Sequence, residues 1–227
     1  MDHIAFIMDG NGRWANSQKK ARKHGHESGS SNVYNIFSSC IDLGINSATF
    51  FAMSSENMYR SKEETDYISY LLDKSIKHHL HDLLNNKVKF KVIGDITNLP
   101  MSIKKTIQQA EQLTSKFNKY SLNIAYNYGG QWDISNAIET MIDDIGKFDN
   151  TKLPDYLSTG RNYPDLIIRT GGYKRLSNFM LWQSVYSELV FVDTLWPDFC
   201  SDELKKIIND YKSIKRNFGK VDKCQNI

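Results

Sequence analysis

Short apolar segments alternate with longer helix-forming segments along the whole chain, and this alternation restricts the possible folds more than any other feature of the sequence. Each apolar segment has four to six residues, the length of a buried strand. Such an alternation is typical of an α/β domain with a mostly parallel sheet flanked by helices. The six expected strands are His3–Met8, Ser47–Ala52, Val88–Ile93, Ser121–Tyr126, Asp165–Ile168 and Leu189–Val192.

The segments between these strands carry helix signals. No repeat, low-complexity tract or linker divides the chain, and 40% hydrophobic residues suffice for one core, so residues 1–227 are expected to form one domain. The basic stretch 16–26 and the polar connection 146–163 are expected to be surface loops. The expected helices are Glu27–Leu43, Ser61–Leu84, Pro100–Phe117, a helix that ends near Ile145, and Asp202–Lys215.

The expected helix Ser61–Leu84 begins with a capping box formed by Ser61 and Glu64. Apolar residues recur in it every three or four positions and form one continuous stripe. The stripe suits core packing against the sheet or the wall of a long apolar pocket, and periodicity alone does not separate the two. Its histidines, at positions 78, 79 and 81, are expected to be solvated rather than to bind a metal.

The segment from His3 to Trp14, HIAFIMDGNGRW, combines a buried strand with a polar turn. Six mostly apolar residues lead directly into Asp9 and the stretch Gly10–Arg13, which do not suit a strand interior. Backbone N–H groups and a guanidinium in such a compact turn can hold an anion. Because a carboxylate repels phosphate unless a cation lies between them, Asp9 predicts a metal-bound diphosphate at the end of this strand.

Polar residues follow four of the six expected strands at the point where each strand ends. The carboxyl ends of parallel strands lie at one edge of a sheet, where ligands bind, so these residues are expected to gather at one rim. Guanidiniums, carboxylates, amides and hydroxyls together indicate a site for two polyanions and one divalent metal. The residues expected at this rim are Asp9, Asn11, Arg13, Ser54, Asn57, Arg60, Arg169, Arg175, Ser177 and Glu188.

Arginine is scarce in this chain, with seven residues against 22 lysines. Four of the arginines nevertheless follow apolar strand-like runs, and Arg22 lies shortly after the first run. Lysine would suffice for solubility, whereas the planar guanidinium can grip phosphate oxygens with two N–H groups. The placement of arginine therefore supports a diphosphate site.

Composition excludes several other functional classes. A net charge of +3 is too small for a general nucleic-acid binder. The three cysteines form no CxxC pair, which argues against a disulfide framework or a structural zinc site and favours the cytoplasm. No signal peptide precedes the first strand and no run reaches the ~18 apolar residues of a membrane span, so any membrane contact is expected to be peripheral, at the inner face.

Known nucleotide and hydrolase motifs are absent, since the chain contains no GxxxxGK[ST], GxGxxG or GxSxG. The longer motifs that it does contain resemble those of the cis-prenyltransferases, and most closely those of bacterial undecaprenyl diphosphate synthases. The resemblance spans nearly the whole chain in the order of the family. It is carried by MDGNGRWA (8–15), GH (25–26), SSEN (54–57) with Arg60, NYGG (127–130), IRTGG (168–172), RLSNFMLWQ (175–183), YSEL (186–189) and WPDF (196–199).

The resemblance implies an Mg²⁺-dependent homodimer that adds isopentenyl diphosphate units to an allylic diphosphate such as farnesyl diphosphate, with Z double bonds. The implied product is undecaprenyl diphosphate, the precursor of the lipid carrier of cell-wall synthesis. A growing chain adds apolar area worth ~0.8 kcal/mol per buried CH₂, so a hydrophobic tunnel is needed. The stripe of Ser61–Leu84 and apolar residues of the second and third strands are expected to form it.

The matching positions also imply roles for individual residues. Asp9 would coordinate Mg²⁺ and assist departure of the allylic diphosphate, and Asn11 would position the reacting groups or accept a proton through the diphosphate. Ser54 and the catalytic Asn57 would line the reacting centre. Glu188 would supply a metal ligand across the dimer interface. The implied substrate-binding residues are Gly10, Gly12, Arg13, Arg22 and His26 for the allylic diphosphate, Arg169, Arg175 and Ser177 for isopentenyl diphosphate, and Trp14, Glu56, Met58 and Arg60 as further contacts.

Several positions depart from the family pattern, mostly beside the reacting centre. Met58 replaces a common tryptophan, and Tyr173 with Lys174 replaces a common Glu-His pair and adds positive charge near the diphosphate. Asn217 stands where an Arg-x-Gly element would have its arginine. The remaining departures are Met53, for a common aromatic residue, and Gln131, for a common arginine.

Three functions are compatible with these residues. The first is regular cis-prenyl chain elongation. The second, suggested by Met58, Gln131 and Asn217, is a short-chain or irregular prenyl coupling enzyme. The third is a non-catalytic prenyl diphosphate-binding subunit, which retention of Asp9 and Arg169 disfavours.

Overall fold

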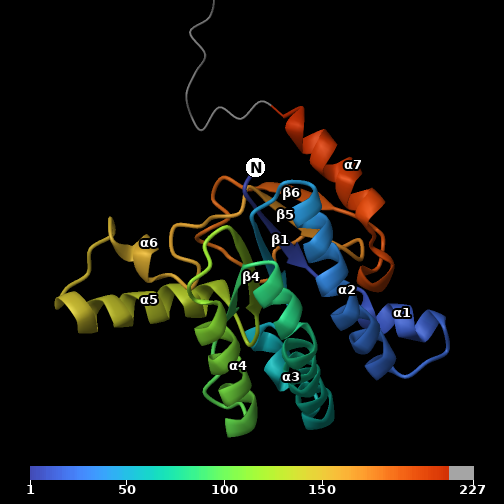
Figure 1. Ribbon diagram of the computed structural model, residues 1–227, viewed down its shortest axis with the longest axis horizontal. Coiled ribbons are helices and arrows are strands. Elements are labelled where there is room, and N and C mark those ends of the chain that lie inside the picture. Colours follow the sequence, from blue (N-terminus) through green and yellow to red (C-terminus); the bar gives the residue numbers. More distant parts are fainter. Residues whose placement is uncertain (215–227) are drawn as a thin grey trace, which may run out of the picture.

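The computed structural model describes residues 1–214, which form one α/β domain around a six-stranded sheet (Figure 1). The strand order is β3-β4-β2-β1-β5-β6, and every neighbouring pair is parallel. The predicted fold class is therefore confirmed. The strands are β1 (His3–Ile7), β2 (Ser47–Phe51), β3 (Val88–Ile93), β4 (Tyr120–Ala125), β5 (Leu166–Arg169) and β6 (Glu188–Phe191).

Helices connect most of these strands, and two short 3₁₀ helices border the edge of the sheet where the strands end. In Figure 1, α3 lies between α2 and α4, and α7 lies beside α2. The helices are α1 (Asn11–Ser17), α2 (Arg22–Asp42), α3 (Lys62–Asn85), α4 (Met101–Thr114), α5 (Gly130–Ile145), α6 (Leu153–Tyr156) and α7 (Ser201–Lys212), and the 3₁₀ helices are η1 (Ser55–Tyr59) and η2 (Trp196–Asp198).

The two faces of the sheet bury different clusters of side chains, because successive residues of a strand point to opposite faces. In β1, Ile4 and Phe6 join the large cluster, to which α2, α3, α4 and α7 contribute apolar residues. Ala5 and Ile7 join a smaller cluster on the other face, together with Phe179 from the segment after β5. The apolar stripe of α3 thus belongs partly to the core.

The strands that follow β1 in the chain are added first on one side of it and then on the other. β1 pairs with β2 on one side and with β5 on the other, and the strands after each of these lie further outward. In open parallel sheets the loops at such a switch point diverge and leave a crevice at the carboxyl ends of the strands. The loops after β1, β2 and β5 border this crevice.

Two predicted loops are wrong. The stretch 16–26 contains the end of α1 and the start of α2, and the connection 146–163 contains α6. β1 ends at Ile7, and Gly10, with φ of +113°, adopts a left-handed conformation, so that α1 begins at the next residue instead of a longer turn. The first turn of α2 is exposed and polar, so it has no apolar periodicity that would mark its start at Arg22 rather than Glu27.

Candidate active site

The loops after β1, β2 and β5, with the first turn of α2, surround a polar pocket at the carboxyl edge of the sheet. These segments are distant in sequence, and the crossover at β1 brings them together. Residues after β4 do not line this pocket in the described part of the chain, so the predicted rim is narrower than expected. The predicted residues that the pocket unites are Asp9, Gly10, Asn11, Gly12, Arg13, Arg22, His26, Ser54, Asn57, Arg60, Arg169, Arg175 and Ser177.

Asp9 is the one acidic residue among the described residues that line this pocket. Its Oδ2 accepts a hydrogen bond from Arg169 Nη2 at 2.8 Å, and its Oδ1 accepts one from Arg13 Nη2 at 3.3 Å. Arg13 Nη2 also donates to the carbonyl oxygen of Gly171 at 2.7 Å. The carboxylate therefore holds two guanidiniums, one from α1 and one from the end of β5, at fixed positions.

Arg169, the last residue of β5, is buried with an exposed fraction of 4%. Besides the bond to Asp9, its Nη1 donates to Ser177 Oγ at 2.8 Å and to the carbonyl oxygen of Arg175. Ser177 has φ of +50°, which is uncommon for a residue with a Cβ. A buried guanidinium with these three partners fixes the loop after β5 against the loop after β1.

A second carboxylate, Glu64 in the first turn of α3, binds the cations on the other side of the pocket. Its Oε1 is 2.9 Å from Arg60 Nη1, 3.0 Å from His26 Nε2 and 3.2 Å from Arg22 Nη2. Although burial alone would raise the pKa of Glu64, the hydrogen bond from His26 and the charges of Arg60 and Arg22 lower it. Burial lowers the pKa of His26, and the contact with Glu64 opposes this shift.

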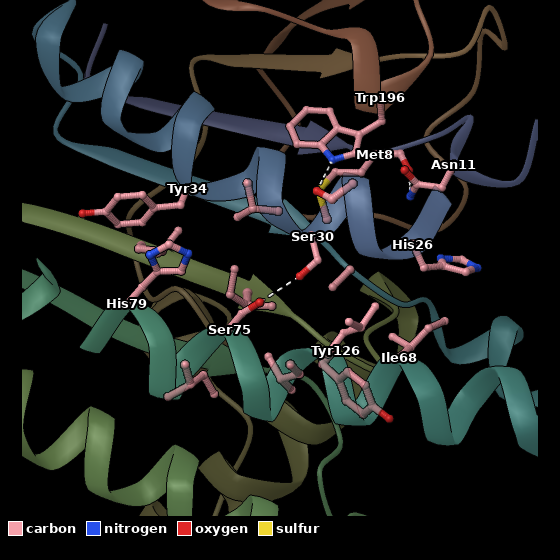
Figure 2. Close-up of a pocket in the computed structure, with 18 of the residues that line it drawn as sticks. Met8, Asn11, His26, Ser30, Tyr34, Ile68, Ser75, His79, Tyr126 and Trp196 are labelled. Carbon is pink, nitrogen blue, oxygen red and sulfur yellow. Dashed lines mark hydrogen bonds between the residues drawn. The ribbon is translucent and has the colours of Figure 1, made fainter. Parts of the chain in front are cut away.

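An apolar pocket extends from the polar one between α2, α3 and the sheet (Figure 2). The two pockets share four lining residues, Met8, Asn11, His26 and Ala52. Away from the polar pocket the walls are mainly aliphatic and aromatic. They include Val33, Ile68, Leu72, Ile76, Phe90 and Leu122. A polar head site therefore continues into a space suited to a hydrocarbon tail.

Polar side chains also line the apolar pocket at two places. Ser30 Oγ of α2 lies 2.8 Å from Ser75 Oγ of α3, so a hydrogen bond joins the two helices along the pocket wall (Figure 2). Further from the polar pocket, the rings of Tyr34 and His79 stack with centroids 4.1 Å apart. Each pair joins the two helices that flank the space.

Two glycines of α2 allow Asn11 to pack directly against the helix backbone. A Cβ added at Gly25 would lie 1.9 Å from the carbonyl oxygen of Asn11, and one added at Gly29 would lie 2.2 Å from its Oδ1. Asn11 Nδ2 donates to the carbonyl oxygen of Met8 at 3.4 Å, whereas its Oδ1 is buried with no hydrogen-bond partner in the described residues. The unpaired hydrogen-bond acceptor, Oδ1 of Asn11, therefore lies where the two pockets meet.

Comparison with known proteins agrees with this geometry. Residues 7–219 match the family model described as undecaprenyl diphosphate synthase. The chain belongs to the undecaprenyl diphosphate synthase family. An isoprenyl transferase of Nitrosomonas europaea is 42% identical over 224 residues, covering 96% of this chain and 85% of that protein. Members of this family are prenyl transferases, and this chain is therefore an enzyme of that class.

Two further comparisons concern proteins that are named for different products. A ditrans,polycis-undecaprenyl-diphosphate synthase of Shewanella oneidensis, named as specific for (2E,6E)-farnesyl diphosphate, is 40% identical, covering 96% of this chain and 82% of that protein. The crystal structure of lavandulyl diphosphate synthase from Lavandula x intermedia, in complex with dimethylallyl diphosphate, superposes with a TM-score of 0.90 at 31% identity, covering 96% of this chain and 98% of that one.

Three residues of this chain that are predicted to contact substrate do not line its polar pocket. Trp14 Nε1 donates to Asp198 Oδ1 at 2.7 Å, and Glu56 Oε1 accepts a hydrogen bond from Asn178 Nδ2 at 2.7 Å. Met58 packs against the large core cluster. Each instead fixes a loop or helix that borders the pocket.

Glu188 lies away from Asp9 within the same chain. It is the first residue of β6 and pairs with Leu166, whereas the polar pocket lies at the other end of the strands, beyond Arg169. It therefore cannot share a metal with Asp9 of its own chain, and its predicted role across a dimer interface stays a prediction. Asn217, another predicted point of departure, lies outside the described residues.

The carboxylate oxygens of Asp9 in the polar pocket suit a Mg²⁺ ion that would be shared with a diphosphate. No group of three or more His, Cys, Asp or Glu side chains able to hold a metal occurs within residues 1–214. Mg²⁺, however, is commonly bound by one or two carboxylates together with water and substrate phosphate oxygens. Each oxygen of Asp9 accepts one hydrogen bond and keeps a lone pair for a cation.

Two functional contacts in and beside the pocket escape prediction from the sequence. Glu64 has the spacing of a capping box, and its backbone N–H does donate to Ser61 Oγ at 3.3 Å, but its carboxylate binds the cations. Tyr173 stands out in the sequence only as a departure from the family, and its ring lies over three guanidiniums of the pocket.

None of the helices within residues 1–214 has the length and apolar character needed to cross a membrane.

Proposed function

We propose that this enzyme condenses isopentenyl diphosphate with an allylic diphosphate, with farnesyl diphosphate as the starter, to form Z-undecaprenyl diphosphate for the cell-wall lipid carrier. The observation that supports this proposal is the junction of the two pockets. A guanidinium-rich head site shares Met8, Asn11, His26 and Ala52 with an apolar space between α2 and α3. This combination suits a substrate with a diphosphate head and a hydrocarbon tail that grows during the reaction.

The polar pocket contains two groups of cations, and we assign one diphosphate to each. Arg13, Arg22 and the backbone from Gly10 to Gly12 would hold the allylic diphosphate, with His26 and Arg60 beside them. Arg169, Arg175 and Ser177 would hold isopentenyl diphosphate. Guanidiniums are suited to both tasks because each can present two N–H groups to one phosphate.

Asp9 would hold Mg²⁺ together with the allylic diphosphate. When bound, the ion supplies positive charge that stabilises the negative charge of the departing diphosphate. Departure breaks the allylic C–O bond, the C=C of isopentenyl diphosphate forms the new C–C bond to the allylic carbon, and loss of one proton restores a double bond. Asn11, with its unpartnered buried Oδ1, would orient the reacting groups, and Ser54 and Asn57 would line the reacting centre.

A short-chain or irregular prenyl coupling enzyme is the second candidate. Two observations favour it: the Ser30–Ser75 hydrogen bond joins the walls of the apolar pocket, and the chain has the fold of a lavandulyl diphosphate synthase with a TM-score of 0.90. Met58, at a position of departure from the family, packs against the large core cluster. A non-catalytic diphosphate-binding subunit is less favoured, because Asp9 and Arg169 are both present and paired in the pocket.

Product analysis separates these functions. Purified enzyme with Mg²⁺, farnesyl diphosphate and labelled isopentenyl diphosphate is expected to form a long Z-prenyl diphosphate, to be measured by mass spectrometry after dephosphorylation. A product of ten or fifteen carbons would replace the leading proposal by the second one. Absence of incorporation with every allylic starter tested, while farnesyl diphosphate still binds, would support the non-catalytic function.

We further propose a homodimer that forms through the exposed apolar surface beside the edge strand β6. Large apolar side chains are exposed there, including Val185 at 62% and Leu189 at 42%. An apolar patch next to an unpaired strand edge is typical of a protein interface. It also lies next to Glu188, whose predicted role requires a partner subunit.

Val185→Glu is expected to convert this dimer into a monomer, because it places a charge within the apolar surface. Sedimentation velocity at micromolar concentration measures the change. Phe148→Glu is a matched control, since Phe148 is also exposed, at 52%, but belongs to the connection between α5 and α6. A monomeric unmodified enzyme, or a Val185→Glu variant that remains dimeric, would contradict this assignment.

A further inference from the structure

Tyr173 lies in the loop after β5, and its ring faces three guanidiniums of the polar pocket. The distances from the ring centroid to the guanidinium carbons are 4.2 Å for Arg175, 5.0 Å for Arg13 and 5.8 Å for Arg169. All three lie within the roughly 6 Å over which an aromatic face attracts a cation. One side chain thus contacts cations that come from α1, from the end of β5 and from the loop after β5.

The carboxylates around the pocket form ion pairs with some of its cations but not with all of them. Glu64 pairs with Arg22, Arg60 and His26, and Asp9 pairs with Arg13 and Arg169. Within residues 1–214, the guanidinium of Arg175 forms no ion pair with a carboxylate, and the ring of Tyr173 is its closest aromatic partner. Three like charges held near one another without a diphosphate repel each other, and the electron-rich ring face reduces this cost.

A ring holds a cation differently from a carboxylate. A carboxylate accepts hydrogen bonds from the guanidinium and competes with phosphate for the same N–H groups. An aromatic face attracts the cation but takes none of the in-plane N–H donors. The charge of Arg175 therefore stays available to an incoming anion.

We propose that Tyr173 is a positioning residue that holds Arg169 and Arg175, the proposed ligands of isopentenyl diphosphate, close to Arg13 of the allylic site, so that the guanidiniums are preformed for binding diphosphate. The inference rests on the proposed function, because it takes the ligand of the pocket to be a diphosphate. The ring, and not the hydroxyl, carries this role, since the hydroxyl forms no hydrogen bond with another residue in the described part of the chain. The guanidinium of Arg175, which has no carboxylate partner within residues 1–214, is the cation most dependent on the ring.

Binding of inorganic pyrophosphate in the presence of EDTA tests this role without metal or turnover. Isothermal titration is expected to show affinity weakened about five- to ten-fold in Tyr173→Leu, in proportion to the lost cation–π contacts. Tyr173→Phe, which keeps the ring, is expected to restore affinity to within about two-fold of the unmodified enzyme. Tyr70→Leu is the control, because Tyr70 is similarly exposed but lies on α3 beside Tyr67.

Two results would overturn the inference. One is unchanged pyrophosphate affinity in Tyr173→Leu, and the other is an equal loss in Tyr173→Phe and Tyr173→Leu. In steady-state assays, Tyr173→Leu is expected to raise the KM for isopentenyl diphosphate by about the same factor as the dissociation constant, with a smaller change in kcat. Should pyrophosphate binding follow the expectation while no condensation occurs, the proposed function would fail and the role of Tyr173 would stand.

Discussion

Asp9→Asn is expected to lower the rate of prenyl transfer by about 1000-fold or more, a magnitude typical of losing electrostatic stabilisation of a leaving group. The amide has nearly the same shape as the carboxylate, so the loop after β1 keeps its packing. The negative charge that would hold Mg²⁺ is lost, and the polar pocket then has no acidic lining residue in the described chain. Single-turnover assays with labelled isopentenyl diphosphate measure the rate.

The affinity of the Asp9→Asn variant for pyrophosphate is not expected to fall with the rate. The neutral amide would no longer compensate the charges of Arg13 and Arg169, so pyrophosphate in EDTA is expected to bind to Asp9→Asn at least as tightly as to the unmodified enzyme. Asp143→Asn, on the exposed side of α5, removes the same charge far from the pocket and is expected to keep full activity. An Asp9→Asn variant with more than about a tenth of the original rate would exclude the proposed role of this carboxylate.

Ser30→Leu is expected to shorten the product by one or more five-carbon units. Ser30 lines the apolar pocket 2.8 Å from Ser75, so a leucine there would fill space between α2 and α3 that the growing chain would need. The leucine side chain would occupy part of this pocket, and the chain should therefore stop earlier. Mass spectrometry of the dephosphorylated products gives the length distribution.

Ser31→Leu provides a matched control on the same helix. Ser31 is exposed, and its hydroxyl donates to the carbonyl oxygen of Glu27 within α2, outside the apolar pocket. The product of this variant is expected to be unchanged. Identical products from Ser30→Leu and the unmodified enzyme would show that the space between α2 and α3 does not hold the chain.

The sequence is sufficient to predict the sheet and the position of its binding edge. Hydrophobic runs locate the strands within one or two residues, and the rule that parallel strands end at one edge brings Asp9 and Arg169 together although they are 160 positions apart. The start of α2 escapes prediction because its first turn is polar and exposed, which leaves no apolar pattern to detect.

Pairings between distant side chains are not predictable in the same way. Glu64 has the spacing of a capping box, and nothing nearby in sequence reveals that its carboxylate binds Arg22, which lies 42 positions earlier. The stripe of α3 predicts an apolar wall, but not that Ser75 meets Ser30 from α2. Such contacts depend on how two helices are rotated about their axes, and local periodicity does not specify this rotation.

The two glycines of α2 have a mechanical consequence. The same helix that bears Gly25 and Gly29 against Asn11 also presents Ser30 to the apolar pocket, less than one turn beyond Gly29. No side chain lies between its backbone and Asn11 to absorb a shift. The position of Asn11 is therefore tied to that of the helix that borders the hydrocarbon space, and a substitution that displaces α2 at Ser30 would also change where Asn11 lies beside the diphosphate site.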